Sequence, residues 1–193
     1  METKLNIISE FLKCLSITII SMLLLNFTVV IFAIIFNNLG DNAIILSTDL
    51  AMIVSLIVFP LVIHAKFLGD LRFYHITWKK IVDFNVIIIF FILLCKFFPT
   101  IYVLHFLAVS ISEETFSREI QFKYLYERIG KINAIIITSI IFAFILHLNE
   151  KFIENLIIRL PLGLALCIIR NKLGLLKSIL GHWFYNLIII FVV

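Results

Sequence analysis

The stretch that decides the fold runs from Cys14 to Phe36 and reads CLSITIISMLLLNFTVVIFAIIF. It carries no charged residue, and a helix needs about 20 apolar residues to cross the hydrocarbon core of a bilayer. The rest of the chain is similar, because 63% of its 193 residues are hydrophobic and only 15% are charged. Soluble domains are about 45–50% apolar and about 25% charged. The composition therefore excludes a soluble globular domain, a disordered chain and a disulfide-framed secreted module.

Six further apolar runs have the length expected of membrane helices or approach it. They lie at about residues 43–64, 81–98, 100–114, 132–148, 152–169 and 173–193. We therefore predict an all-α fold, a polytopic membrane helix bundle of about seven transmembrane helices. No linker rich in Pro, Gly or Ser divides the chain. Residues 1–193 are thus expected to form a single integral membrane domain, with a motif-bearing catalytic core at about 100–193.

The basic residues predict how these helices are oriented. The net charge is only +4, and the basic residues form no patch with interleaved aromatics, so we expect no nucleic-acid partner. Most of them lie before the first apolar run or after the second, fourth and sixth runs. These residues are Lys4, Lys13, Lys66, Arg72, Lys79, Lys80, Arg118, Lys123, Arg128, Lys131, Arg170, Lys172 and Lys177. Because positive loops stay in the cytoplasm, we predict a cytoplasmic amino terminus and a carboxyl terminus outside.

Polar groups inside apolar runs are the functional candidates, since an ionisable group in hydrocarbon costs several kcal/mol unless it is paired or solvated. The candidates are His105, Glu113, Glu114, Arg118, His147, Arg159, His182 and Asn186. The three cysteines, Cys14, Cys95 and Cys167, lie far apart in or beside apolar runs. We expect them to be small buried hydrophobes rather than metal or redox groups.

Three groups of these residues carry chemistry. Glu114 and Arg118 are four apart and can pair on one helix face, which leaves Glu113 about 100° away as a free base. His147 ends the fifth run. His182 and Asn186 share a face of the last run and could stabilise an oxyanion. Each group also has a structural interpretation, as a helix cap, an interfacial histidine or a polar contact between helices.

Together these groups are the components of a hydrolase that uses water as its nucleophile, because no serine or cysteine lies in a recognisable nucleophile motif. Two histidines and a glutamate, namely Glu113, His147 and His182, could instead bind zinc with one open position. The familiar HExxH spacing is absent. We therefore expect no cofactor, with zinc as the alternative.

The ordered set of motifs resembles the CPBP family (CAAX proteases and bacteriocin-processing proteins, also called Abi), whose signature is EExxxR, then FxxxH, then HxxxN or HxxxD. The resemblance covers about residues 107–187 and includes the segments PLGLAL at 161–166 and LGLLKS at 173–178. It implies that Glu113 activates water with His147 as its partner. It further implies that His182 and Asn186 hold the oxyanion, with Glu114 and Arg118 as structural support.

The chain departs from the family pattern at three positions. Ser117 and Glu119 replace the usual Phe and Gly around Arg118, and Ala143 stands four residues before His147, where the family has Phe. Phenylalanines fall at 142 and 144 instead. Counted from the membrane surfaces along straight helices, His147 would also lie further out than Glu113. For the two residues to meet, the fifth helix has to start deeper or the helices have to tilt strongly; otherwise the site is not assembled.

The resemblance implies an intramembrane endopeptidase of a bacterial cell membrane. Its partners would be membrane lipids and a membrane-associated or lipidated peptide or protein substrate. The alternative is a non-catalytic bacteriocin self-immunity or membrane scaffold protein that retains the fold. A small transporter is less well supported, because no inverted repeat or pair of broken helices is evident.

Overall fold

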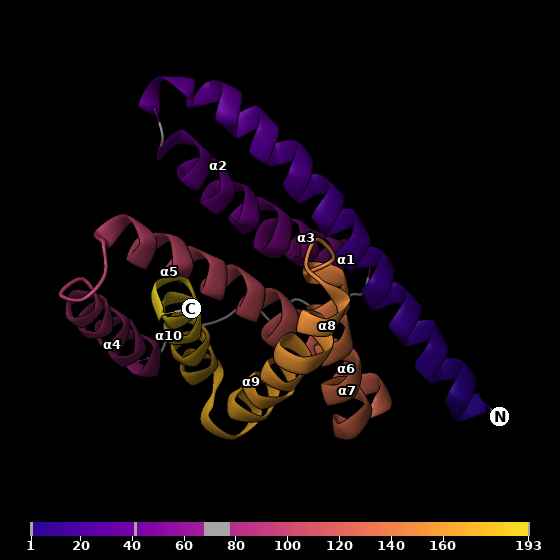
Figure 1. Ribbon diagram of the computed structural model, residues 1–193. Coiled ribbons are helices and arrows are strands. Elements are labelled where there is room, and N and C mark those ends of the chain that lie inside the picture. Colours follow the sequence, from indigo (N-terminus) through magenta and orange to yellow (C-terminus); the bar gives the residue numbers. More distant parts are fainter. Residues whose placement is uncertain (1, 41, 68–77, 193) are drawn as a thin grey trace.

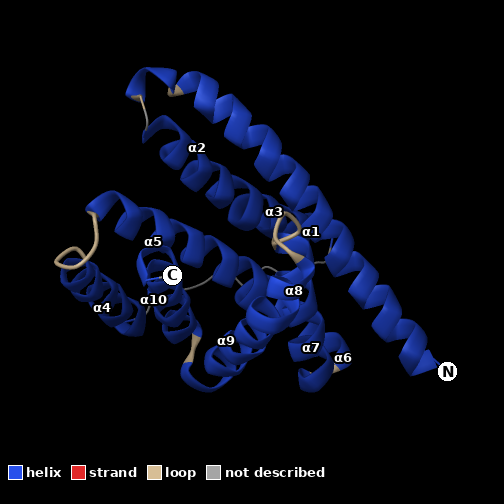
Figure 2. Cartoon of the chain, viewed as in Figure 1, coloured by secondary structure: helices blue, strands red, loops and turns tan. Residues whose placement is uncertain are grey.

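The computed structural model describes residues 2–40, 42–67 and 78–192. Within these ranges the chain is almost entirely helical and contains no strand (Figure 2). The prediction of an all-α helical bundle is therefore confirmed. Arg72, which the orientation argument uses, lies outside the described residues.

Helical elements that follow one another without a break form seven rods over the described residues (Figure 1). The first four rods are α1 (Glu2–Ile35), α2 (Asn42–Ile53) with α3 (Phe59–Phe67), α4 (Trp78–Leu94), and α5 (Thr100–Glu114) with α6 (Phe122–Ile129). The last three are α7 (Lys131–Ile141), α8 (Phe152–Glu154) with α9 (Leu160–Leu173), and α10 (Leu175–Val192). The rods correspond one to one with the seven predicted apolar runs.

Three helical stretches are long and apolar enough to cross a membrane, namely Asn6–Ile35, Asn42–His64 and Phe152–Leu173. Three further apolar helices are shorter, at Asn85–Leu94, Lys131–Leu146 and Leu175–Phe191. The predicted bounds were wrong at two places. Helix α1 begins at Glu2, well before Cys14, because its first turns pack Ile7 and Phe11 against the core. Helix α4 ends at Leu94, since the chain turns before Pro99, which cannot continue a helix.

The first two rods, α1 and α2, run antiparallel to each other (Figure 1). Helices α1 and α2 lie side by side, α5 packs against both α2 and α10, and α9 packs against α7 and α10. Gly130 and Gly174 close the turns from α6 to α7 and from α9 to α10, with φ values of +81° and +94° that favour glycine. These two turns bring the motif-bearing helices back against one another.

The surface of the bundle suits lipid, because large aliphatic and aromatic side chains are exposed along α1, α2, α4 and α10. Cys14 and Cys167 are fully buried and Cys95 is half-buried, and all three are free thiols. This agrees with their predicted role as small apolar residues.

Candidate active site

The turn at Gly130 sets the depth of two site residues. Glu113 lies 17 residues before this glycine and His147 lies 17 residues after it. Because α5–α6 and α7 form an antiparallel pair, equal arms of about 25 Å bring both residues to the same level. Counting each helix from the membrane surface places His147 further out, whereas counting from the shared turn places it level with Glu113, as the 3.7 Å between the two side chains requires.

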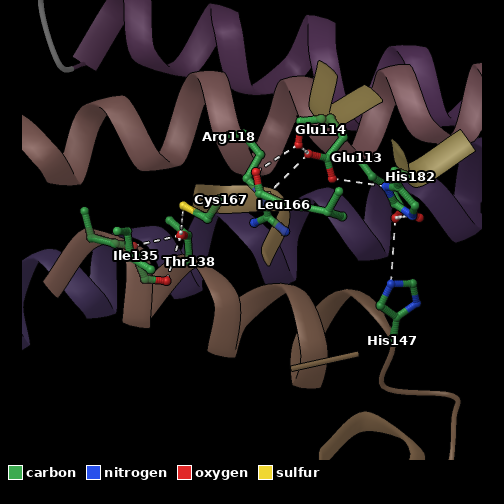
Figure 3. A network of polar contacts seen from close by, with 11 residues as sticks. Glu113, Glu114, Arg118, Ile135, Thr138, His147, Leu166, Cys167 and His182 are labelled. Atoms are coloured by element: carbon green, nitrogen blue, oxygen red, sulfur yellow. Dashed lines mark hydrogen bonds and ion pairs between the residues drawn. The ribbon is translucent and has the colours of Figure 1, made fainter. Parts of the chain in front are cut away.

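Glu113 lies between two histidines (Figure 3). Its Oε2 is 3.7 Å from Nε2 of His147 and 3.7 Å from Nε2 of His182. The three side chains come from α5, from the end of the α7 rod and from α10. All are shielded, with side-chain exposures of 10% for Glu113, 15% for His147 and 3% for His182. The fold therefore brings together three of the four residues predicted to be catalytic.

Glu114 is the second hub of the site (Figure 3). Its carboxylate lies 3.6 Å from Nε of Arg118, as the spacing of four residues predicts. Nδ1 of His182 donates to Oε1 across 3.0 Å, because an ionised carboxylate can only accept. The Ser178 hydroxyl donates to Oε2. The two adjacent glutamates thus divide their contacts, since Glu114 binds the supporting groups and Glu113 faces the two Nε2 atoms.

Phe142 occupies the space between the charged groups. Its ring is edge-on to His147 at 5.0 Å and to His182 at 5.7 Å, and the Arg118 guanidinium lies 4.6 Å from its centroid. Phe142 stands five residues before His147, one more than the family spacing. The helix compensates, because Phe142–Leu146 is a π-helical turn whose bonds span five residues instead of four. The apparent departure at Ala143 is therefore absorbed by the backbone.

Gly163 on α9 leaves room for the Phe142 ring where α9 packs against α7. A Cβ atom at this position would lie 3.2 Å from Cδ1 of Phe142 and 3.5 Å from both Cα and Cβ of Ser139. The absence of a side chain lets α9 approach α7 and hold the phenylalanine ring in place. The close packing of α9 against α7 thus explains the glycine in the 161–166 segment.

Three other candidates lie outside the cluster. Asn186 is half-buried one turn beyond His182 and has no hydrogen bond or ion pair among the described residues. His105 pairs with Asp49 of α2 at 2.6 Å. Arg159 pairs with Glu150 at 3.0 Å.

Sequence reasoning missed Ser178 and Asp49. Ser178 could have been found, since it precedes His182 by four residues and shares its helix face. Asp49 pairs across two rods, so only the tertiary structure reveals its partner.

In the described ranges, no group of three or more His, Cys, Asp or Glu side chains is arranged to hold a metal ion. Glu113, His147 and His182 stay the ligands that the zinc alternative requires. Their arrangement also suits the handling of a proton, because one carboxylate oxygen faces two imidazole nitrogens.

The fold and the site define the class of this protein as a helical membrane bundle with carboxylates and imidazoles buried between its rods. Residues 95–188 match the family model described as Rce1-like, type II CAAX prenyl endopeptidase. This match over the carboxyl-terminal part of the chain supports the CPBP/CAAX protease family that the motifs predict. This is a family of CAAX-type intramembrane proteases, which are hydrolases. No curated protein and no solved structure matches the chain.

Proposed function

We propose that the protein is an intramembrane endopeptidase in which Glu113 and His147 activate a water molecule. The observation that carries this proposal is the position of Glu113 Oε2, which lies 3.7 Å from Nε2 of both His147 and His182. A general base must lie within hydrogen-bond reach of its proton, directly or through one water. Two nitrogens around one carboxylate oxygen suit a shared water.

The chemistry would proceed without a covalent intermediate. Glu113 takes a proton from water while the water oxygen attacks the scissile carbonyl carbon, and His147 orients the same water. The tetrahedral intermediate then collapses, the C–N bond breaks, and the proton held by Glu113 moves to the leaving amine. Donors aimed at the developing oxyanion would supply the largest share of the catalysis.

His182 suits the oxyanion role only as an imidazolium, since its Nδ1–H already donates to Glu114 and a neutral ring would leave Nε2 without a proton. Asn186, on the same helix face, would add a second donor once a substrate is bound.

The substrate that we propose is a membrane-associated or lipidated peptide. Two observations support it: the site is buried between apolar helices, and the family's printed description is that of a CAAX prenyl endopeptidase. The motif of such substrates is a prenylated cysteine followed by three residues. We further propose a multi-pass protein of a bacterial cell membrane with its amino terminus in the cytoplasm.

The test measures, in proteoliposomes, the cleavage of a quenched fluorescent peptide whose prenylated cysteine is followed by three residues at the carboxyl end. Glu113→Gln keeps the shape of the side chain but removes the base, so we expect the rate to fall about 100-fold or more. Glu119→Gln is the matched control. Glu119 lies on the same rod, is similarly shielded and pairs with Arg170 at 2.7 Å. We expect it to retain activity.

Unchanged cleavage by Glu113→Gln would remove this residue as the base. Absence of cleavage by the wild-type protein, with bacteriocin protection that survives Glu113→Gln, would favour the self-immunity alternative. The peptide without its prenyl group tests the substrate class, because equal cleavage of both peptides would argue against lipid recognition.

A further inference from the structure

His147 lies where its helix stops, so its position depends on contacts outside the helix. Its backbone has φ −113° and ψ 40°, after the last π-helical residue, Leu146. Its carbonyl oxygen accepts two hydrogen bonds, from the backbone N–H of Glu150 at 3.1 Å and from Nδ2 of Asn155 at 2.8 Å. The second bond is the only side-chain hydrogen bond to this residue in the described ranges.

Asn155 reaches His147 from the next rod. It begins the π-helical turn Asn155–Arg159, and only 3% of its surface is exposed. The same turn makes a second tie, because Nη2 of Arg159 lies 3.0 Å from Oε1 of Glu150. One short turn therefore holds the segment after His147 at two points. The Asn155 amide acts on His147 itself, while the ion pair acts on the end of the segment.

Among the described residues, the imidazole has one aromatic contact, the Phe142 ring at 5.0 Å, and one carboxylate nearby, Glu113 Oε2 at 3.7 Å. Neither contact is a hydrogen bond. The direction of the ring toward Glu113 thus depends on where the backbone of His147 is held, and the shorter of the two hydrogen bonds to its carbonyl oxygen comes from Asn155.

We infer that Asn155 is a positioning residue, which fixes the His147 backbone so that the imidazole faces Glu113. This inference rests on the proposed function, since it assigns His147 a role in orienting water. Asn155 lies outside all three sequence motifs. Misplacement of a catalytic group by 1 Å can cost about 100-fold in rate, so a single backbone tie can matter greatly for kcat.

The experiment compares two asparagines that make the same kind of bond at opposite ends of the α7 rod. Nδ2 of Asn133 donates to the carbonyl oxygen of Ile129 at 2.9 Å, close to the Gly130 turn. Asn155→Leu and Asn133→Leu each remove one amide donor with little change in volume. In the prenylated-peptide assay we expect Asn155→Leu to lower kcat about 10- to 100-fold with KM nearly unchanged. We expect Asn133→Leu to keep the wild-type kcat.

A double variant separates positioning from general stability. If Asn155 acts through His147, adding Asn155→Leu to His147→Ala should produce no further loss of residual activity. A further loss equal to that of Asn155→Leu alone would overturn the inference. Should Asn155→Leu fail to fold, Asn155→Gln and Asn155→Asp decide the question. Gln keeps a donor and should recover kcat relative to Asp, whereas equal rates would overturn the positioning role.

The outcomes also distinguish this inference from the proposed function. Wild-type kcat in Asn155→Leu together with an impaired His147→Ala would overturn only the inference. Full activity in His147→Ala would overturn the role of His147 in the proposed mechanism itself.

Discussion

Deletion of Ala143 should leave the active site intact, although it removes a fully buried residue from the helix that carries His147. The π-helical turn Phe142–Leu146 holds one residue more than an α-helical turn. Removing Ala143 would let the turn become α-helical and place Phe142 four residues before His147. Side chains four apart on an α-helix have Cβ atoms about 5–6 Å apart, close enough to keep the present ring contact of 5.0 Å.

The same deletion made elsewhere in the helix should abolish activity. Ile136 lies in the α-helical part of α7, and its side chain is 46% exposed, so losing the side chain itself costs little. Its deletion turns the following residues by about 100° relative to those before it. A side-chain atom about 5 Å from the helix axis then moves about 8 Å. That displacement exceeds the 3.7 Å between His147 and Glu113.

Cleavage of the prenylated peptide in proteoliposomes gives the measurement, with thermal unfolding in detergent as the check on folding. We expect the Ala143 deletion to retain activity within about tenfold of wild type, because the site geometry is kept, and to lose about 1 kcal/mol of stability with the buried methyl group. The Ile136 deletion should lose about 100-fold or more. The reasoning is refuted if the Ala143 deletion folds normally but is as inactive as the Ile136 deletion.

Two further predictions concern packing and metal. Gly163→Val should lower the stability of the folded protein by about 1–3 kcal/mol, because a Cβ here already lies 3.2 Å from Phe142. Thermal unfolding measures this loss, and Gly181→Ala, whose Cβ meets nothing closer than Leu166 Cδ2 at 3.9 Å, should be neutral. Incubation with 1,10-phenanthroline should leave the cleavage rate unchanged under the water-activation mechanism. Loss of activity that added zinc restores would instead support the zinc alternative at Glu113, His147 and His182.

The sequence predicts the rods well, because the length of an apolar run is a local property that translates directly into a membrane helix. It also predicts the Glu114–Arg118 pair, since a spacing of four residues fixes both side chains on one face. The close approach of Glu113 and His147 was harder to predict from the sequence, because it depends on where the chain turns. The turn itself was present in the sequence as Gly130, halfway between the two residues.

Two features of the structure could not be predicted from the spacing of residues in the sequence. Asp49 lies within an apolar run, and its partner His105 stands 56 residues away on another rod. The π-helical turn at Phe142–Leu146 also carries no reliable sequence signal. The motif comparison interpreted it as a missing phenylalanine at 143, whereas the backbone restores that aromatic contact with Phe142.

The position of Phe142 explains how the bundle tolerates a buried arginine. All three guanidinium nitrogens of Arg118 lack a hydrogen-bond partner in the described part of the chain, and the side chain is fully buried. Such a group would be costly without compensation. Glu114 supplies the opposite charge at 3.6 Å, and the ring of Phe142 at 4.6 Å lies within the range of cation–π attraction. The π-helical turn therefore places the ring of Phe142 where it has two roles. The ring packs against the site histidines, and it stabilises Arg118, which holds Glu114 in place.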